Sequence, residues 1–177
     1  MDTQTERWNI DFVVAKSIRY HAYRRAFWDR FDNLSKMLTI VSGTAVLVTI
    51  VGDKNLAAVI LSVIVTFTSA ADLVLGFSMK ARDHDGLYKA FSRLAQDIAE
   101  NDNPTEADIN GWRRRRLEIE MDEPYIVDLL ERRCSGEEAD ARGCERRPAW
   151  KLTKWQTRMA QWGLWPASRR DDVPDPC

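Results

Sequence analysis

A long apolar stretch with almost no charge constrains this chain most strongly. The 41 residues from Met37 to Phe77 contain only three charged side chains, Asp53, Lys54 and Asp72, although 30% of the 177-residue sequence is charged. A soluble helical bundle of this size has too little protein to cover such a stretch on every face. The stretch therefore predicts insertion into a lipid bilayer, and a buried soluble hairpin is the alternative interpretation.

The apolar stretch divides into two predicted membrane spans, at residues 35–52 and 56–77. The second span has 22 residues, and a helix of that length measures about 33 Å, enough to cross ~30 Å of hydrocarbon. Only three residues separate the spans, so they must return antiparallel as a tight hairpin. The predicted fold class is an all-α membrane protein, a two-transmembrane antiparallel helical hairpin with long cytoplasmic helix extensions and short C-terminal helices.

Basic residues flank the spans unequally. Seven Lys and Arg residues precede Met37 and four follow closely after the second span, whereas the turn contains Lys54 alone. Cytoplasmic loops of membrane proteins carry an excess of Lys and Arg. The sequence therefore predicts a multi-pass protein with both termini in the cytoplasm.

Apolar residues continue at helical spacing on both sides of the spans. After the second span, they recur at intervals of four, three and four residues, as in a packed helix seam. In an antiparallel hairpin centred near residue 54, opposite residues have numbers that sum to about 108. This register predicts a cytoplasmic seam of Ile10, Val14, Leu87, Phe91, Leu94 and Ile98.

Asp72 is a carboxylate inside the second predicted span, where charge is costly. The same register places Lys36 opposite it and predicts an ion pair between the two. Small polar side chains, which are hydroxyls except for Asp72, also form one stripe on each span. The stripes are Ser35, Thr39, Ser42 and Thr49 on the first span, and Ser62, Thr66, Ser69 and Asp72 on the second. Either they pack the helices closely through hydrogen bonds, or they line a water-filled pore in an oligomer.

Three domains are predicted along the chain. Residues 1–133 contain the hairpin with its cytoplasmic helices, residues 134–149 form a polar, mobile linker, and residues 150–177 form a Trp-rich amphipathic segment. The candidate membrane-surface residues of that last segment are Trp155, Trp162, Lys151, Lys154 and Arg158. Basic helices with tryptophans suit lipid headgroups. Docking of the same tryptophans onto the helical bundle is the alternative.

No motif for catalysis or cofactor binding occurs in the sequence. It has no Gly-rich phosphate loop, HExxH motif or nucleophile elbow, and its three cysteines have no histidine nearby. We therefore expect no enzyme activity, no catalytic residues, no cofactor and no bound metal. The run Arg113–Arg116 is offset by Glu118 and Glu120, so we expect no nucleic-acid partner.

The only two histidines, His21 and His84, fall at nearly complementary heights on the helices that flank the spans. They are either ordinary residues of the helix surface or seam, or a site that senses pH or binds metal.

Two segments around the spans carry a family resemblance. "RRAFWDRFDNLSKM" leads into the hairpin and "HDGLYKAFSRLAQDIAE" follows it, and together with the short turn they resemble the SLATT family. That family comprises two-transmembrane effector domains associated with bacterial nucleotide synthetases and nucleotide sensors. The resemblance implies a bacterial antiviral conflict protein that forms a homo-oligomer and opens a pore in the inner membrane on activation.

The same resemblance implies partners for the chain. Besides the lipid bilayer and further copies of itself, we expect a separate sensor or nucleotide-synthetase partner to deliver the trigger. Two other functions stay open at this point. One is a non-conducting membrane scaffold, and the other is a prophage-encoded exclusion protein.

Overall fold

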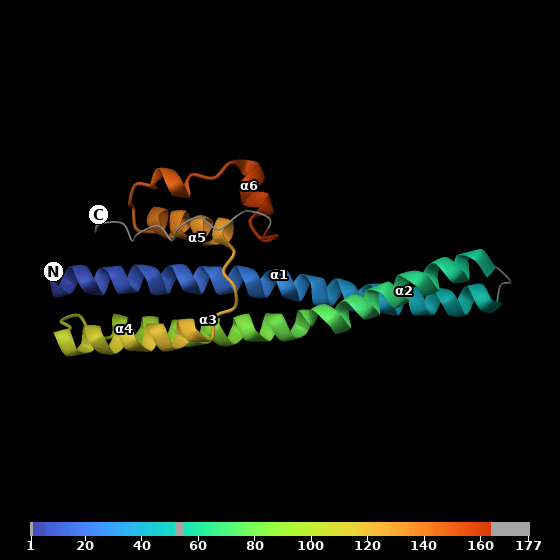
Figure 1. The fold of residues 1–177 in the computed structure, drawn as a ribbon, viewed down its shortest axis with the longest axis horizontal. Helices are drawn as coiled ribbons and strands as arrows, with labels where there is room; N and C mark the ends of the chain where they lie inside the picture. Colours follow the sequence, from blue (N-terminus) through green and yellow to red (C-terminus); the bar gives the residue numbers. More distant parts are fainter. Residues whose placement is uncertain (1, 52–54, 164–177) are drawn as a thin grey trace. The chain divides into compact units, whose positions relative to one another are not determined.

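The computed structural model describes residues 2–51 and 55–163, with the backbone alone for residues 44–51, 55, 57 and 58. Within these residues every regular element is helical and none is a strand, which confirms the predicted all-α class. The helices, drawn in Figure 1, are α1 (Thr3–Val51), α2 (Asn55–Leu75), α3 (Phe77–Ala99), α4 (Glu106–Met121), α5 (Asp128–Ala141), the 3-10 helix η1 (Pro148–Trp150) and α6 (Lys154–Met159).

The chain divides into two compact units, which we describe separately. The first, called the packed unit, comprises Met1–Arg24 and His84–Cys177, and the second, called the apolar unit, comprises Arg25–Asp83. This division differs from the predicted domains at 1–133, 134–149 and 150–177. The difference arises because α1 and α3 each contribute residues to both units. Residues 164–177 of the predicted Trp-rich segment lie outside the described residues.

In the packed unit, the first half of α1 is covered on two sides (Figure 1). Toward α5 and η1, Phe12 packs with Ala139 and Trp150, while Tyr20 packs with Leu130 and Cys134. Toward α3 and α4, one apolar cluster joins Ile10, Val14, Phe91, Leu94, Ile98, Ile109 and Trp112. The apolar residues of α1 thus point in several directions, and this helix forms the centre of the unit.

The six residues of the predicted cytoplasmic seam are all buried in the structure. Five of them belong to the cluster between α1, α3 and α4. Leu87 is also buried but lies outside that cluster. The four, three, four spacing on α3 therefore marks the face that packs against α1.

Helix α5 replaces much of the predicted mobile linker. Residues 134–141 are helical, and the side chains of Cys134 and Ala139 are fully buried. The acidic residues of the helix pair with cations of α1, with Lys16 Nζ 2.8 Å from Glu131 Oε1 and Arg19 Nε 2.6 Å from Glu138 Oε2. The linker prediction is wrong here because the polar composition serves contacts with α1 rather than solvation.

A close backbone approach also depends on α5. A Cβ atom at Gly136 would lie 3.2 Å from the carbonyl oxygen of Trp150. Because glycine has no Cβ, η1 can pack directly against this helix. Gly136 lies within the predicted linker, but in the structure it allows a close contact between α5 and η1.

In the apolar unit, a single residue separates α2 from α3. Gly76 has a φ of 57°, a left-handed conformation that glycine adopts without strain. Hydrogen bonds still run from Gly76 N to Asp72 O and from Lys80 N to Gly76 O. Helical hydrogen bonds therefore continue on both sides of Gly76, while the left-handed residue rotates the buried face of α3 relative to that of α2.

One helical stretch among the described residues meets the length and hydropathy of a membrane span. It runs from Val59 to Ala99, through Gly76, and its most apolar window has a mean hydropathy of 2.0. One such stretch fits a membrane-associated helical protein. It does not by itself establish two spans or an orientation, so both stay predictions.

Candidate functional site

A groove between α1 and α2 is the candidate site in the apolar unit. It has a volume of about 500 Å³ and is lined by Ser35, Lys36, Thr39, Ile40, Ser69, Asp72 and Leu73. Residues three and four apart on a helix share a face. This spacing places four polar side chains of the two predicted stripes, with Lys36, along one groove.

Asp72 lies in this groove without a polar side-chain partner among the described residues. Its side chain is half-buried, and no hydrogen bond or ion pair joins its carboxylate to another described residue. The predicted ion pair with Lys36 does not form. Both residues nevertheless line the same groove, which is where the antiparallel register places them.

Lys36 instead pairs within its own helix. Its Nζ lies 2.6 Å from Oδ2 of Asp32, one helical turn earlier. An acid and a base four residues apart on a helix meet without any constraint from a second helix. Asp32 was missed in the sequence interpretation, although its i, i+4 spacing to Lys36 was the signal that could have identified it.

The two hydroxyl stripes are placed differently by the structure. On α1, Ser35 and Ser42 are buried and Thr39 is half-buried, so that stripe faces inward. On α2, Ser62, Thr66 and Ser69 are exposed. Thr39 and Thr66 donate to the carbonyl oxygens of Ser35 and Ser62, one turn earlier. The side chain of Thr49 lies outside the described residues.

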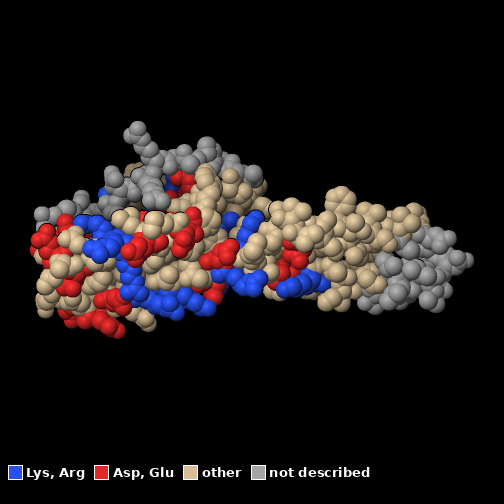
Figure 2. Space-filling view, turned by 60° about the horizontal axis from the view of Figure 1, so that its bottom comes forward, with Lys and Arg blue, Asp and Glu red and all other residues tan. Residues whose placement is uncertain are grey.

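The rest of the apolar unit exposes large hydrophobic side chains. On α2 alone these are Leu56, Val59, Ile60, Val63, Ile64, Phe67, Leu73, Val74 and Leu75. Figure 2 shows this end of α1 and α2 as a largely tan surface on the face drawn. Soluble monomers rarely expose a contiguous apolar surface of this extent.

Aromatic side chains cluster near the two ends of the apolar stretch, Met37 and Phe77, where charged residues become frequent again. The rings of Trp28 and Phe31 lie 6.0 and 5.7 Å from that of Phe77. Lys80 Nζ lies 4.6 Å from the centre of the Trp28 ring. The numbers of Phe31 and Phe77 sum to 108, so the antiparallel register also places these two residues opposite each other. Aromatic residues with lysine are typical of a membrane–water interface.

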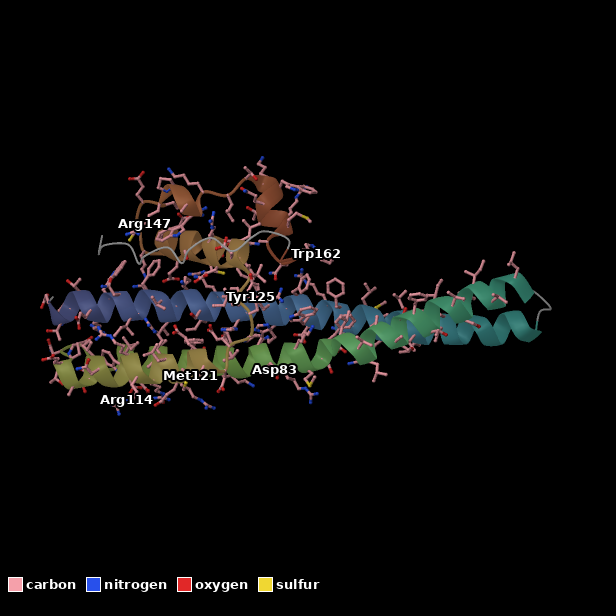
Figure 3. All side chains as sticks on the ribbon, in the orientation of Figure 1. Asp83, Arg114, Met121, Tyr125, Arg147 and Trp162 are labelled. Carbon is pink, nitrogen blue, oxygen red and sulfur yellow. The ribbon has the colours of Figure 1, made fainter. Side chains whose placement is uncertain are left out.

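The candidate membrane-surface residues lie in and around α6. Trp155 and Trp162 are 63% and 52% exposed, and Lys151, Lys154 and Arg158 are exposed as well. Figure 3 labels Trp162 just beyond α6. A different tryptophan, Trp150, is buried in the packed unit. Contact of Trp155 and Trp162 with lipid headgroups stays a prediction, and their exposure favours it over docking on the bundle.

A polar network in the packed unit joins the two histidines. His21 Nδ1 lies 3.0 Å from His84 Nδ1, and His21 Nε2 lies 3.0 Å from Glu123 Oε1. The Tyr20 hydroxyl accepts a hydrogen bond from the backbone N–H of Val127, and burial raises the pKa of this phenol to about 12. The complementary heights indicated the histidine contact, but no sequence signal indicated Glu123.

Comparison with known proteins gave no relative: no protein-family model, no curated protein and no solved structure matches the chain.

Proposed function

We propose that the chain is an integral membrane protein whose apolar unit inserts as a two-span hairpin. The exposed apolar surface of α2, which only a lipid environment or a protein partner would cover, supports this. The aromatic cluster of Trp28, Phe31 and Phe77 suits the cytoplasmic interface. Both termini then lie in the cytoplasm of a bacterial cell, as the distribution of Lys and Arg favours.

We propose further that the hairpins assemble into a homo-oligomer that conducts ions through the inner membrane when activated. The observation that supports this most is the half-buried Asp72 carboxylate, which has no polar partner among the described residues. A carboxylate is costly within a membrane segment, and such residues usually face a bundle interior or a water-filled cavity. In an oligomer, copies of Asp72 would form a ring of negative charge that attracts cations.

The test is Asp72→Asn in the full chain, reconstituted in planar bilayers. At an effective dielectric constant of ~20, a carboxylate ~10 Å from a monovalent cation stabilises it by about 1.7 kcal/mol, more than tenfold in occupancy. We therefore expect roughly tenfold lower cation conductance, with insertion and oligomer size unchanged. Toxicity in expressing cells should fall in parallel.

Asp83→Asn is the matched control, because Asp83 is an exposed acid on α3 (Figure 3) outside the apolar stretch. It removes the same charge and should leave conductance unchanged. If the Asp72 variant assembles normally and conducts as the wild type does, Asp72 does not line a pore.

A non-conducting membrane scaffold is the second candidate function. The buried Ser35 and Ser42 favour it, because they turn the hydroxyl stripe of α1 toward the inside of the unit rather than toward a pore. A prophage-encoded exclusion protein would use the same architecture. Either function predicts a correctly assembled protein with no current in bilayers.

A further inference from the structure

The two histidines of the chain meet in the interior of the packed unit. His21 comes from α1 and His84 from α3, and their side chains are 1% and 3% exposed. Their Nδ1 atoms are 3.0 Å apart, and Glu123 approaches the other nitrogen of His21 at 3.0 Å. Glu123 belongs to the segment between α4 and α5, in which Figure 3 labels Tyr125. Three separate parts of the chain are thus joined by two imidazole rings.

The hydrogen positions in this network follow from the chemistry of its members. A carboxylate only accepts hydrogen bonds, so His21 Nε2 must carry a hydrogen toward Glu123. A neutral His21 then has a bare Nδ1, and the hydrogen between the rings must belong to His84 Nδ1. The neutral pair therefore has one satisfied arrangement, with a single hydrogen between the two facing nitrogens.

The surroundings of the pair oppose a proton on His84, and Glu123 lies against His21 alone. On α1, Arg24 is the nearby cation and donates to the carbonyl oxygen of Gln161, while Tyr20 is a neutral phenol beside both rings. On α3, the apolar Phe91 stacks on His21 at 5.5 Å. On α5, Cys134 is a buried thiol whose pKa is raised by burial. Glu123 is the anion that contacts the pair directly.

We propose that the His21–His84 pair is a proton-operated latch, which holds α1, α3 and the segment around Glu123 together until both rings are protonated, and then releases them. One added proton can rest on His21 beside Glu123 if His84 carries its hydrogen on Nε2, which leaves a single hydrogen between the rings. A second proton places two N–H groups between nitrogens 3.0 Å apart and a charge on His84, which contacts no anion among the described residues. The proposal goes beyond the membrane function and does not depend on it.

The direction of the pH effect follows from linkage. Burial, the neighbouring His21 ring and the Arg24 guanidinium lower the pKa of His84 from 6.5 to about 3. A group whose pKa is lowered in the closed state stabilises that state fully above pH 6.5, and the stabilisation is lost progressively as the pH falls toward 3. The local opening equilibrium should therefore rise about tenfold between pH 7.5 and pH 5.5.

Hydrogen–deuterium exchange of the full chain in lipid nanodiscs tests the latch. We expect the protection of residues 84–91 and 122–127, corrected for intrinsic exchange, to fall about tenfold between pH 7.5 and pH 5.5. His84→Asn should abolish this response, because its amide can donate to His21 but does not titrate. Glu123→Gln is the matched control: it weakens the bond to His21 at both pH values, so it should lower protection throughout and keep the tenfold pH response.

A second measurement does not depend on any variant. Nitrogen NMR of the imidazole rings at pH 7.5 should show His21 protonated at Nε2 and His84 at Nδ1. Equal protection at the two pH values, or an undiminished pH response in His84→Asn, would overturn the latch. Ring signals that shift when a chelator is added would also overturn it, in favour of a metal bound between the histidines.

Discussion

Replacing Phe91 with alanine should lower the free energy of unfolding by about 3 to 5 kcal/mol. Phe91 is fully buried in the cluster that α3 forms with α1 and α4, and its ring stacks on His21. Removing the ring leaves a cavity that helices fixed at several other contacts cannot close. Chemical denaturation of the full chain in mild detergent, followed by near-ultraviolet circular dichroism, measures the loss.

Leu117→Ala provides the matched control for this experiment. Leu117 is an apolar residue of α4 whose side chain is 49% exposed. Surface substitutions of this kind usually change stability by less than about 0.5 kcal/mol. An unfolding free energy for Phe91→Ala as high as that of the control would show that the seam between α1 and α3 is not a closed core.

Replacing Phe67 with lysine should prevent membrane insertion of α2. Phe67 lies near the middle of α2 and is 75% exposed. On insertion scales, exchanging Phe for Lys at a helix centre costs about 3 kcal/mol, roughly a 100-fold change in the insertion equilibrium. The measurement is the fraction of full-length chain that resists carbonate extraction from inner-membrane vesicles.

Two controls separate the membrane interpretation from a soluble one. Phe67→Leu keeps an apolar side chain and should insert normally. Met121→Lys places the same charge at an equally exposed position, 78%, on α4 of the packed unit, and should also insert normally. In a soluble protein, lysine at position 67 would be tolerated or would improve solubility, and that result would reject the membrane hairpin.

The sequence predicted those parts of the fold that depend on periodicity. The spacing of Leu87, Phe91, Leu94 and Ile98 identified the buried face of α3, and the antiparallel register brought Phe31 near Phe77. Both inferences rest on helix geometry, which is nearly independent of context. The placement of Lys36 and Asp72 in one groove follows from the same geometry.

Pairings decided by tertiary contacts could not be predicted in this way. Lys36 had two acids within reach, and its bond to Asp32 depends on side-chain conformations that the register does not specify. The second half of α5 looked like a linker because residues 134–149 are polar, and the cationic partner of Glu138, Arg19, lies more than a hundred residues earlier on α1. Glu123 was missed as a partner of His21 for the same reason, since the contact joins residues distant in sequence.

The left-handed Gly76 lets the faces of α2 and α3 be set independently. The half-buried positions of α2 include Leu61, Val65, Thr68 and Asp72, and the next buried residue, Phe77, comes after a step of five rather than three or four. A residue added to α2 can therefore be accommodated at the glycine without turning the face of α3 away from its neighbours. In the proposed membrane hairpin, the length of α2 can then follow the thickness of the bilayer, while the seam of α3 keeps its own constraints.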